Sequence, residues 1–145
     1  MNLLKATGKL VGVKYVLGSM DTDKGLDCFS LIINYLRNIG YNIPDDLEFK
    51  GHTLKDYGEK YSEDPNIINI ACEYLTTILQ TVPITKAVAG DILFACLENN
   101  APSFGIDGGN GTMVIVSESG GVQIIDKKHY TIKQVLRCRR QSPPF

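Results

Sequence analysis

The sequence predicts an α+β domain, in which helices from the N-terminal half pack on one side of an antiparallel sheet formed by the C-terminal half. Two observations lead to this prediction. Apolar residues recur at helical spacing up to about residue 79, and short strand-like runs separated by turn compositions follow from Gly90 onward. The chain has 145 residues and suits a single domain over residues 1–145, because half of this length would be short of a core.

The best-marked helix is expected to begin at Cys28 and to end before Gly40. Asp27 precedes it as a good N-cap residue, and Gly40 suits the position just after the last turn. The apolar face of this helix consists of Cys28, Leu31, Ile32, Tyr35, Leu36 and Ile39. Their spacing of three and four residues places them on one side of the helix.

A second helix is expected from Pro65 to about Leu79, with Pro83 closing the segment. Its apolar face consists of Ile67, Ile68, Ala71, Tyr74, Leu75 and Ile78. A polar stretch over residues 44–61 separates the two helices, and we expect one short helical turn around Leu54 to Tyr61.

The C-terminal half is expected to form a meander of strands. The strand-like runs are Asp91–Leu97, Phe104–Asp107, Thr112–Ser117, Val122–Ile125 and Ile132–Arg139. The intervening NNAP, GGNG, SGG and KKHY segments have the composition of turns. Consecutive strands with short turns favour an antiparallel sheet.

Composition excludes several classes of function. The net charge is −1, and the only basic cluster is Arg137, Arg139 and Arg140, which is too small for a nucleic-acid interface. The N-terminus lacks the apolar core of a signal peptide, and no apolar run is long enough for a membrane span. We therefore expect a protein that is cytoplasmic when made, with no nucleic-acid partner.

The four cysteines are widely spaced, with no C-x-x-C motif, so we expect neither zinc nor another cofactor. Cys72 and Cys96 lie in apolar runs and are expected to be buried. Cys28 differs because it stands at the first position of a helix. The unpaired N–H groups there favour a thiolate, although the neighbouring charge of Asp27 opposes it.

Five ordered segments around and after Cys28 together resemble the NlpC-type family of papain-like cysteine peptidases. These segments are Tyr15–Ser19, Gly25–Ile32, Gly40–Pro44, Ala89–Phe94 and Phe104–Met113. They correspond to the family's Tyr-x-x-Gly element, its Gly-x-Asp-Cys motif, the end of its cysteine helix, its Gly-Asp-Leu-Val-Phe strand and its Gly-Asn-Gly hairpin. The resemblance covers roughly residues 13–117.

The resemblance implies a fold and a mechanism. In this family the cysteine attacks an amide carbon, a histidine on the first central strand takes the proton, and a polar residue on the next strand orients that histidine. Typical substrates are the peptide stems of the bacterial cell wall. Cys28 would be the nucleophile, and Tyr15 would line the cleft and help to hold the oxyanion.

Two positions depart from the family pattern. Ser103 stands where the family has its general-base histidine, and Ile115 stands at the orienting position. A serine hydroxyl does not titrate near neutral pH, and an isoleucine cannot fix a histidine tautomer.

The sequence has two histidines, His52 and His129, and we interpret both as loop residues. His52 is the better candidate for a replacement base. Asp107 is interpreted as a residue that caps the GGNG turn, not as a catalytic acid.

Two main functions follow as hypotheses. The favoured one is a degenerate member retained for its shape as a structural or binding component of a larger assembly, such as a bacteriophage tail tip or baseplate, and incorporated into the virion. The alternative is an active cysteine peptidase or amidase that cleaves cell-wall peptides through Cys28 with an unconventional base. A deamidase toxin on the same fold would need the same missing base.

Overall fold

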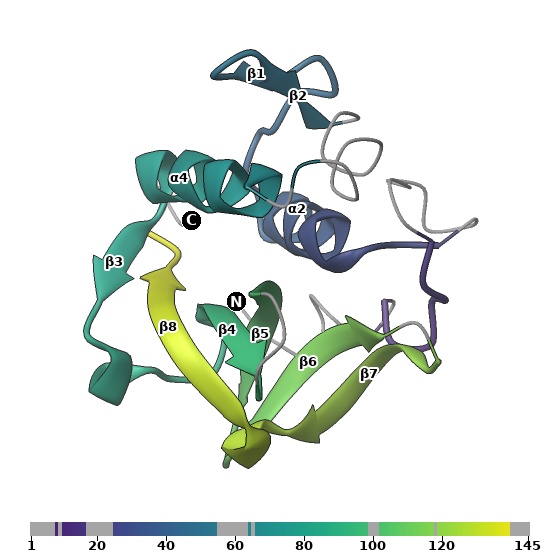
Figure 1. Cartoon of the computed structure of the whole chain (residues 1–145), viewed down its shortest axis with the longest axis vertical. Helices are drawn as coiled ribbons and strands as arrows, with labels where there is room; N and C mark the ends of the chain where they lie inside the picture. Colours follow the sequence, from purple (N-terminus) through teal and green to yellow (C-terminus); the bar gives the residue numbers. More distant parts are fainter. Residues whose placement is uncertain are drawn as a thin grey trace.

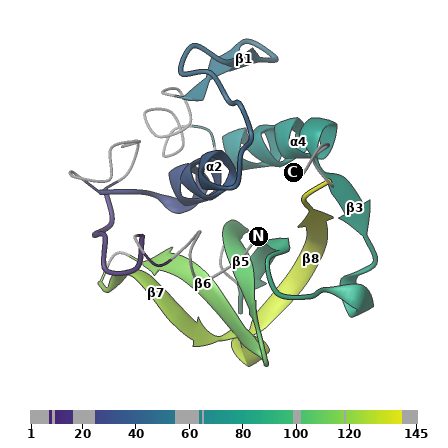
Figure 2. The same cartoon turned by 180° about the vertical axis from the view of Figure 1, so that it is seen from behind.

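The computed structural model describes residues 8, 10–16, 25–54, 64, 66–98, 102–117 and 119–139. Helices α2 (Cys28–Asn38) and α4 (Ile67–Ile78) lie together on one side of a six-stranded sheet (Figures 1 and 2). This is the α+β arrangement that the sequence predicted. The helical turn expected around residues 54–61 and the C-terminal residues 140–145 fall largely or wholly outside the described residues.

The six strands are β3 (Gln80–Val82), β4 (Ile92–Leu97), β5 (Ser103–Gly109), β6 (Thr112–Ser117), β7 (Gly121–Asp126) and β8 (Tyr130–Arg137). Their order across the sheet is β3-β8-β4-β5-β6-β7, and all neighbours are antiparallel. Short 3-10 helices follow β3 (η1, Ile84–Lys86) and connect β7 to β8 (η2, Lys127–His129). The five predicted strands are all present, with ends that differ by a few residues.

Strand β3 was not expected from the sequence. Leu79, which follows α4, is already extended, and Gln80–Val82 then pairs with Val135–Arg137 of β8. Three residues carry too little alternation to signal a strand, and their partner lies more than 50 residues away in the sequence. The pairing therefore depends on the rest of the sheet being formed.

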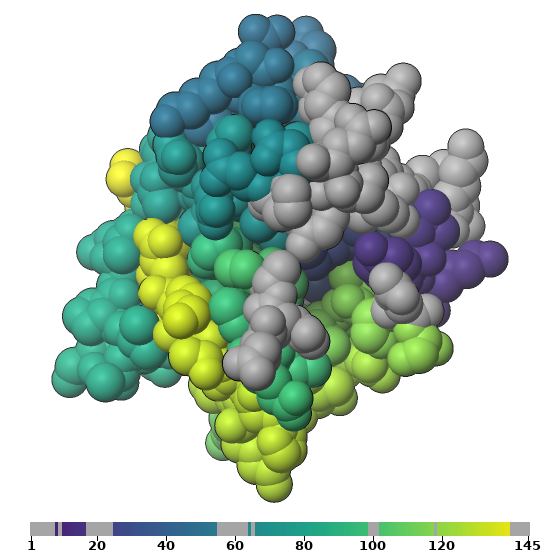
Figure 3. Space-filling view, viewed as in Figure 1, coloured from purple at the N-terminus to yellow at the C-terminus, as the bar shows by residue number. Residues whose placement is uncertain are grey.

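A two-stranded hairpin, β1 (Glu48–Phe49) with β2 (His52–Thr53), occupies part of the stretch that was expected to be a polar connection. Its two-residue turn has positive φ angles at Lys50 (51°) and Gly51 (79°), the geometry of a type I′ turn. The hairpin sits on the side of α4 that faces away from the sheet, and it forms one end of the molecule (Figures 1 and 3).

The buried side chains form two clusters, one on each face of the sheet. The main cluster joins α2 and α4 to the sheet and includes Leu31, Leu36, Leu75, Phe104 and Ile106. The second cluster consists of Val82, Leu93, Met113, Ile115 and Val135. Alternate residues of a strand point to opposite faces, which is why β6 contributes Val114 and Val116 to the first cluster but Met113 and Ile115 to the second.

Two buried carboxylates are neutralised by side chains from later strands and turns. Asp91, just before β4, receives two hydrogen bonds of 2.9 Å from the Arg137 guanidinium. Asp107 pairs with Lys127 at 2.7 Å and accepts the N–H of Gly109 at 2.7 Å. The prediction that Asp107 caps the GGNG turn is thus confirmed, and its charge is paired within the fold.

Candidate functional site

The N-terminus of α2 is fixed by a reciprocal pair of hydrogen bonds. The buried Asp27 carboxylate accepts the N–H of Ser30 at 2.8 Å, and the N–H of Asp27 donates to the Ser30 hydroxyl at 2.8 Å. This capping box satisfies two groups that would otherwise lack partners at a buried helix end. The predicted N-cap is confirmed, and it places Cys28 at the first position of the helix.

The segment that carries Tyr15 lies directly beside the loop leading to Cys28. The N–H of Leu26 donates to the carbonyl of Lys14 at 2.9 Å, and the N–H of Val16 donates to the carbonyl of Leu26 at 3.0 Å. Tyr15 and Leu26 thereby form a parallel bridge, and the partly buried Tyr15 and Cys28 pack against the same core cluster. The role of Tyr15 in holding an oxyanion stays a prediction.

Gly25 explains why this approach is possible. A Cβ atom at Gly25 would lie 2.5 Å from Cγ2 of Val16 and 2.7 Å from the carbonyl oxygen of Lys14. Its φ angle of 142° is also one that residues with a side chain rarely adopt. The glycine that precedes Cys28 by three residues is therefore required by close backbone packing.

The strand side of the site lies under α2. Phe29, next to Cys28, packs against Phe104 with ring centroids 5.9 Å apart, and Ser103 is the first residue of the same strand β5. A Cβ atom at Gly105 would lie 3.3 Å from Cγ2 of Ile115 on β6. Because residues two apart share a face, Ser103 and Ile115 point to the same face of adjacent strands. This face carries the second cluster, whereas Phe104 and Ile106 point to the face on which α2 packs.

Ile115 is built into an apolar environment. It is 8% exposed and packs with Leu93, Met113 and Val135 in the second cluster. None of these side chains can make the hydrogen bond that fixes an imidazole. Ser103, by contrast, is only half-buried at the start of its strand.

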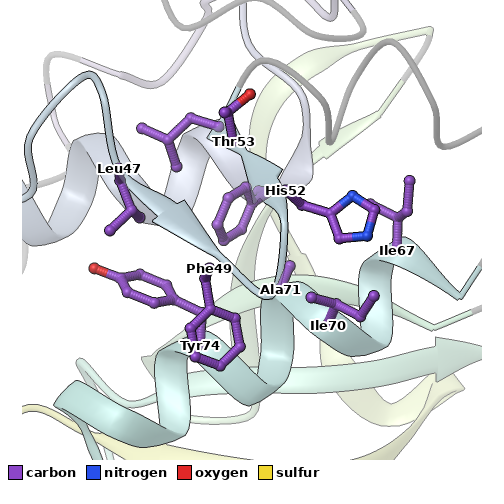
Figure 4. Close-up of a pocket in the computed structure, with 10 residues that line it drawn as sticks. Leu47, Phe49, His52, Thr53, Ile67, Ile70, Ala71 and Tyr74 are labelled. Carbon is purple, nitrogen blue, oxygen red and sulfur yellow. The ribbon is translucent and has the colours of Figure 1, made fainter.

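Neither histidine is placed next to Cys28 by any element described. His52 lies on β2 and lines a pocket against α4, on the side of the helices that faces away from the sheet (Figures 1 and 4). Cys28 does not line that pocket, although the adjacent Phe29 does. His129 ends η2, at the end of the sheet that is remote from α2 in both views (Figures 1 and 2).

The other cysteines have structural surroundings. Cys72 and Cys96 are buried, as predicted. Burial raises the pKa of the Cys72 thiol to about 11, and burial together with the charge of Asp91 raises the pKa of Cys138 to about 11. Such thiols stay protonated and unreactive at neutral pH.

The described ranges contain no group of three or more histidine, cysteine, aspartate or glutamate side chains that could hold a metal ion. No helix within these ranges is long and apolar enough to cross a membrane.

A cysteine at the start of a helix that packs on an antiparallel sheet is the arrangement of the papain-like class of α+β folds. Within this class, the model of the NlpC/P60 family matches residues 12–141, and the chain belongs to that family. A comparison with curated protein sequences found no match.

Solved structures support this fold. The NlpC/p60 domain of the peptidoglycan hydrolase SagA is 18% identical, with a TM-score of 0.58; the alignment covers 94% of this chain and 98% of that one. RipB from Mycobacterium tuberculosis, also described as a peptidoglycan hydrolase, is 22% identical with a TM-score of 0.57, over 96% of this chain and 64% of that one. A protein from Staphylococcus aureus described as similar to a lipoprotein of the NLP/P60 family is 14% identical with a TM-score of 0.58, over 96% and 42% respectively.

Proposed function

We propose that this chain is a degenerate NlpC/P60 domain that serves as a structural or binding component of a larger protein assembly, such as a bacteriophage tail tip or baseplate, with its peptidase activity weak or lost. The observation that carries the proposal is the presence of Ser103 and Ile115 on one face of adjacent strands. These are the positions at which the family resemblance calls for a base and its orienting residue.

The chemistry of the two residues supports the loss of activity. A serine hydroxyl does not accept a proton from a thiol near neutral pH. A cysteine without its imidazole partner retains only a small part of the rate of a complete dyad. Ile115 packs with Leu93, Met113 and Val135, and none of these three side chains can orient an imidazole supplied from elsewhere.

The retained features favour a role that depends on shape. The capping box of α2 and the tight contact at Gly25 keep the backbone of the cysteine helix in place. Both features stabilise the fold whether or not the thiol reacts. A surface for partner proteins needs this framework but does not need a base.

The test is an assay of cell-wall stem-peptide cleavage, run together with a thiol-reactive activity probe on the wild type and on Cys28→Ala. We expect no turnover above the Cys28→Ala background. Turnover that Cys28→Ala abolishes would sink the proposal. Mass spectrometry of purified phage particles from the host strain would test the assembly role, and absence of the chain from the particles counts against the phage placement.

The alternative is an active peptidase or amidase that cleaves cell-wall peptides through Cys28. It is favoured by the similarity of the fold to SagA and RipB, two proteins described as peptidoglycan hydrolases. It requires a base other than Ser103, and His52 is the candidate that the sequence offers. Cleavage that is lost in both Cys28→Ala and His52→Ala, but kept in His129→Gln, would establish this alternative.

A further inference from the structure

The N-terminal segment, Leu10–Val16, lies between the start of β7 and the cysteine loop (residues 25–27), which leads into α2 (Figures 1 and 2). On the β7 side, the N–H of Gly12 donates to the carbonyl of Val122 at 2.8 Å, and the N–H of Val122 donates to the carbonyl of Val13 at 2.7 Å. On the other side, the two hydrogen bonds with Leu26 join the segment to the cysteine loop. The N-terminal segment therefore links the last strand of the sheet to the start of the cysteine helix.

Two glycines allow the N-terminal segment to approach both neighbours closely. A Cβ atom at Gly121, the first residue of β7, would collide with the carbonyl oxygen of Val13 and lie 2.9 Å from Cα of Lys14. A Cβ atom at Gly25 would lie 2.7 Å from the carbonyl oxygen of Lys14. The backbone at Lys14 thus passes between two glycines, and a side chain at either one would have to displace it.

The hydrogen bonds to the two sides come from neighbouring peptide groups. The carbonyl of Val13 accepts the bond from β7, and the carbonyl of the next residue, Lys14, accepts the bond from Leu26. Because each peptide group is planar and rigid, only two soft dihedral angles separate these carbonyls. A displacement of Val13 is therefore passed on to Lys14 and to its bond with Leu26.

The N-terminal segment is also anchored in the core. Leu10 is 3% exposed and belongs to the main cluster, and its carbonyl accepts the N–H of Val13 at 3.0 Å. Val13, Tyr15 and Cys28 pack against this same cluster. The position of Tyr15 thus depends on the contacts of the segment with the core, with β7 and with the cysteine loop.

We propose that Gly121 and Val122, at the start of β7, are positioning residues for Tyr15. They act through the N-terminal segment, which holds Tyr15 beside the cysteine loop. The exposure of the Cys28 thiol therefore depends on β7, the strand at the far end of the sheet from β3. The proposal goes beyond the loss of a base and holds whether or not the domain cleaves peptides.

Hydrogen exchange of backbone amides, followed by NMR on the full chain, measures this link directly. Gly121→Ala adds the colliding Cβ atom, so Lys14 no longer holds the acceptor of the Leu26 amide in place. We expect exchange at Leu26 to become about tenfold faster through local opening. The amide of Leu75, a fully buried residue of α4, reports global unfolding and should change less than that of Leu26.

Gly111→Ala is the matched control for Gly121→Ala. Gly111 has a φ angle of 78°, close to the 65° of Gly121, so an alanine is strained at both positions. A Cβ atom at Gly111, however, would meet no atom within 4 Å. Exchange at Leu26 should therefore be the same in this control as in the wild type.

Alkylation of the cysteines by iodoacetamide, resolved by mass spectrometry, is the second measurement. In Gly121→Ala we expect Cys28 to be labelled roughly threefold faster than in the wild type, because the displaced segment uncovers the thiol. Cys72 is 5% exposed and reacts when the fold opens as a whole. Its labelling should stay slower than that of Cys28 in both proteins, whereas a purely structural effect would raise both rates alike.

A second variant tests the proposal even if Gly121→Ala does not fold. Leu10→Ala removes the core anchor of the N-terminal segment and should also speed exchange at Leu26 and labelling at Cys28. Leu79→Ala is its control. Leu79 is 1% exposed and adjoins β3, at the opposite edge of the sheet from β7, so both rates should stay close to those of the wild type.

The proposal is overturned if a folded Gly121→Ala or Leu10→Ala protein keeps the wild-type rates at Leu26 and Cys28. It is also overturned if the two control variants change these rates as much, because the changes would then report lost stability alone. Faster exchange at Leu26 without faster labelling of Cys28 likewise overturns it, since the N-terminal segment would then move without affecting the thiol.

Discussion

The helix side and the strand side of the candidate site differ in how much of the family pattern they keep. On the helix side, Asp27, Cys28 and Gly25 are present, and Asp27 and Gly25 make the local contacts that hold the helix start in place. On the strand side, Ser103 and Ile115 share one face of the sheet but supply neither a base nor an orienting group. The comparison teaches that the backbone framework of a site can persist after the side chains that use it have changed.

The largest effect is expected when the strand side is given back a polar residue. Ile115→His places an imidazole among Leu93, Met113 and Val135, and these three side chains offer it no hydrogen bond. It should lower the free energy of unfolding by about 3 kcal/mol, measured by urea denaturation. The matched variant Ile115→Val should cost only about 1 kcal/mol. A loss below that of Ile115→Val would show that the orienting position still accepts a polar group.

The second prediction concerns the pH dependence of stability that the buried thiol of Cys72 causes. The pKa of Cys72 is raised to about 11 in the fold, so the folded state holds its proton more tightly than the unfolded chain does. The stability this provides is fully present below about pH 9 and is lost as the pH rises toward 11. The loss attributable to Cys72 is at most about 2.5 kcal/mol. Denaturation curves at pH 8 and pH 11 should differ less in Cys72→Ala than in the wild type, and an equal difference would contradict this account.

The third prediction concerns how much the N-cap residue Asp27 of α2 contributes to the stability of the fold. Asp27→Ala removes the acceptor for the Ser30 N–H and should lower stability by about 2 kcal/mol. Asp27→Asn keeps a side-chain oxygen at the same place, so its cost should be less than half as large. Thermal and urea unfolding of the three proteins would measure this. Equal losses for the two variants would mean that charge, and not capping, makes Asp27 necessary.

The smallest effect on stability, and the most informative about chemistry, is expected from Ser103→His. Ser103 is half-buried at the start of β5, so this change should alter the free energy of unfolding by less than about 1 kcal/mol. The family resemblance puts residue 103 at the base position, where an imidazole would lower the pKa of the Cys28 thiol, so we expect roughly tenfold faster alkylation at pH 7. The rate of iodoacetamide labelling at Cys28, followed by mass spectrometry, is the measurement. Ser103→Asn is the control, and equal rates in both variants would place residue 103 out of reach of the thiol.

The sequence by itself determined the features whose signals lie within a few residues. The spacing of apolar residues and the caps at Asp27 and Gly40 specified α2, and the turn compositions specified β4 to β8. The cap of the GGNG turn by Asp107 was also readable, because donor and acceptor are two residues apart. The order of the family segments then gave the positions of Ser103 and Ile115.

Only the tertiary structure decided the features that depend on contacts between distant segments. Strand β3 exists because β8 offers it an edge, and the Lys50–Gly51 hairpin is positioned by Phe49 and Tyr74 on α4. The pocket around His52 arises from that placement, and a histidine in a polar stretch gives no sequence signal of burial. Likewise, the sequence placed Cys28 at a helix start, but packing set the bridge between Tyr15 and Leu26 and the apolar surroundings of Ile115. Local hydrogen bonds and periodicity are encoded in neighbouring residues, whereas burial and pairing across the fold depend on which surfaces meet.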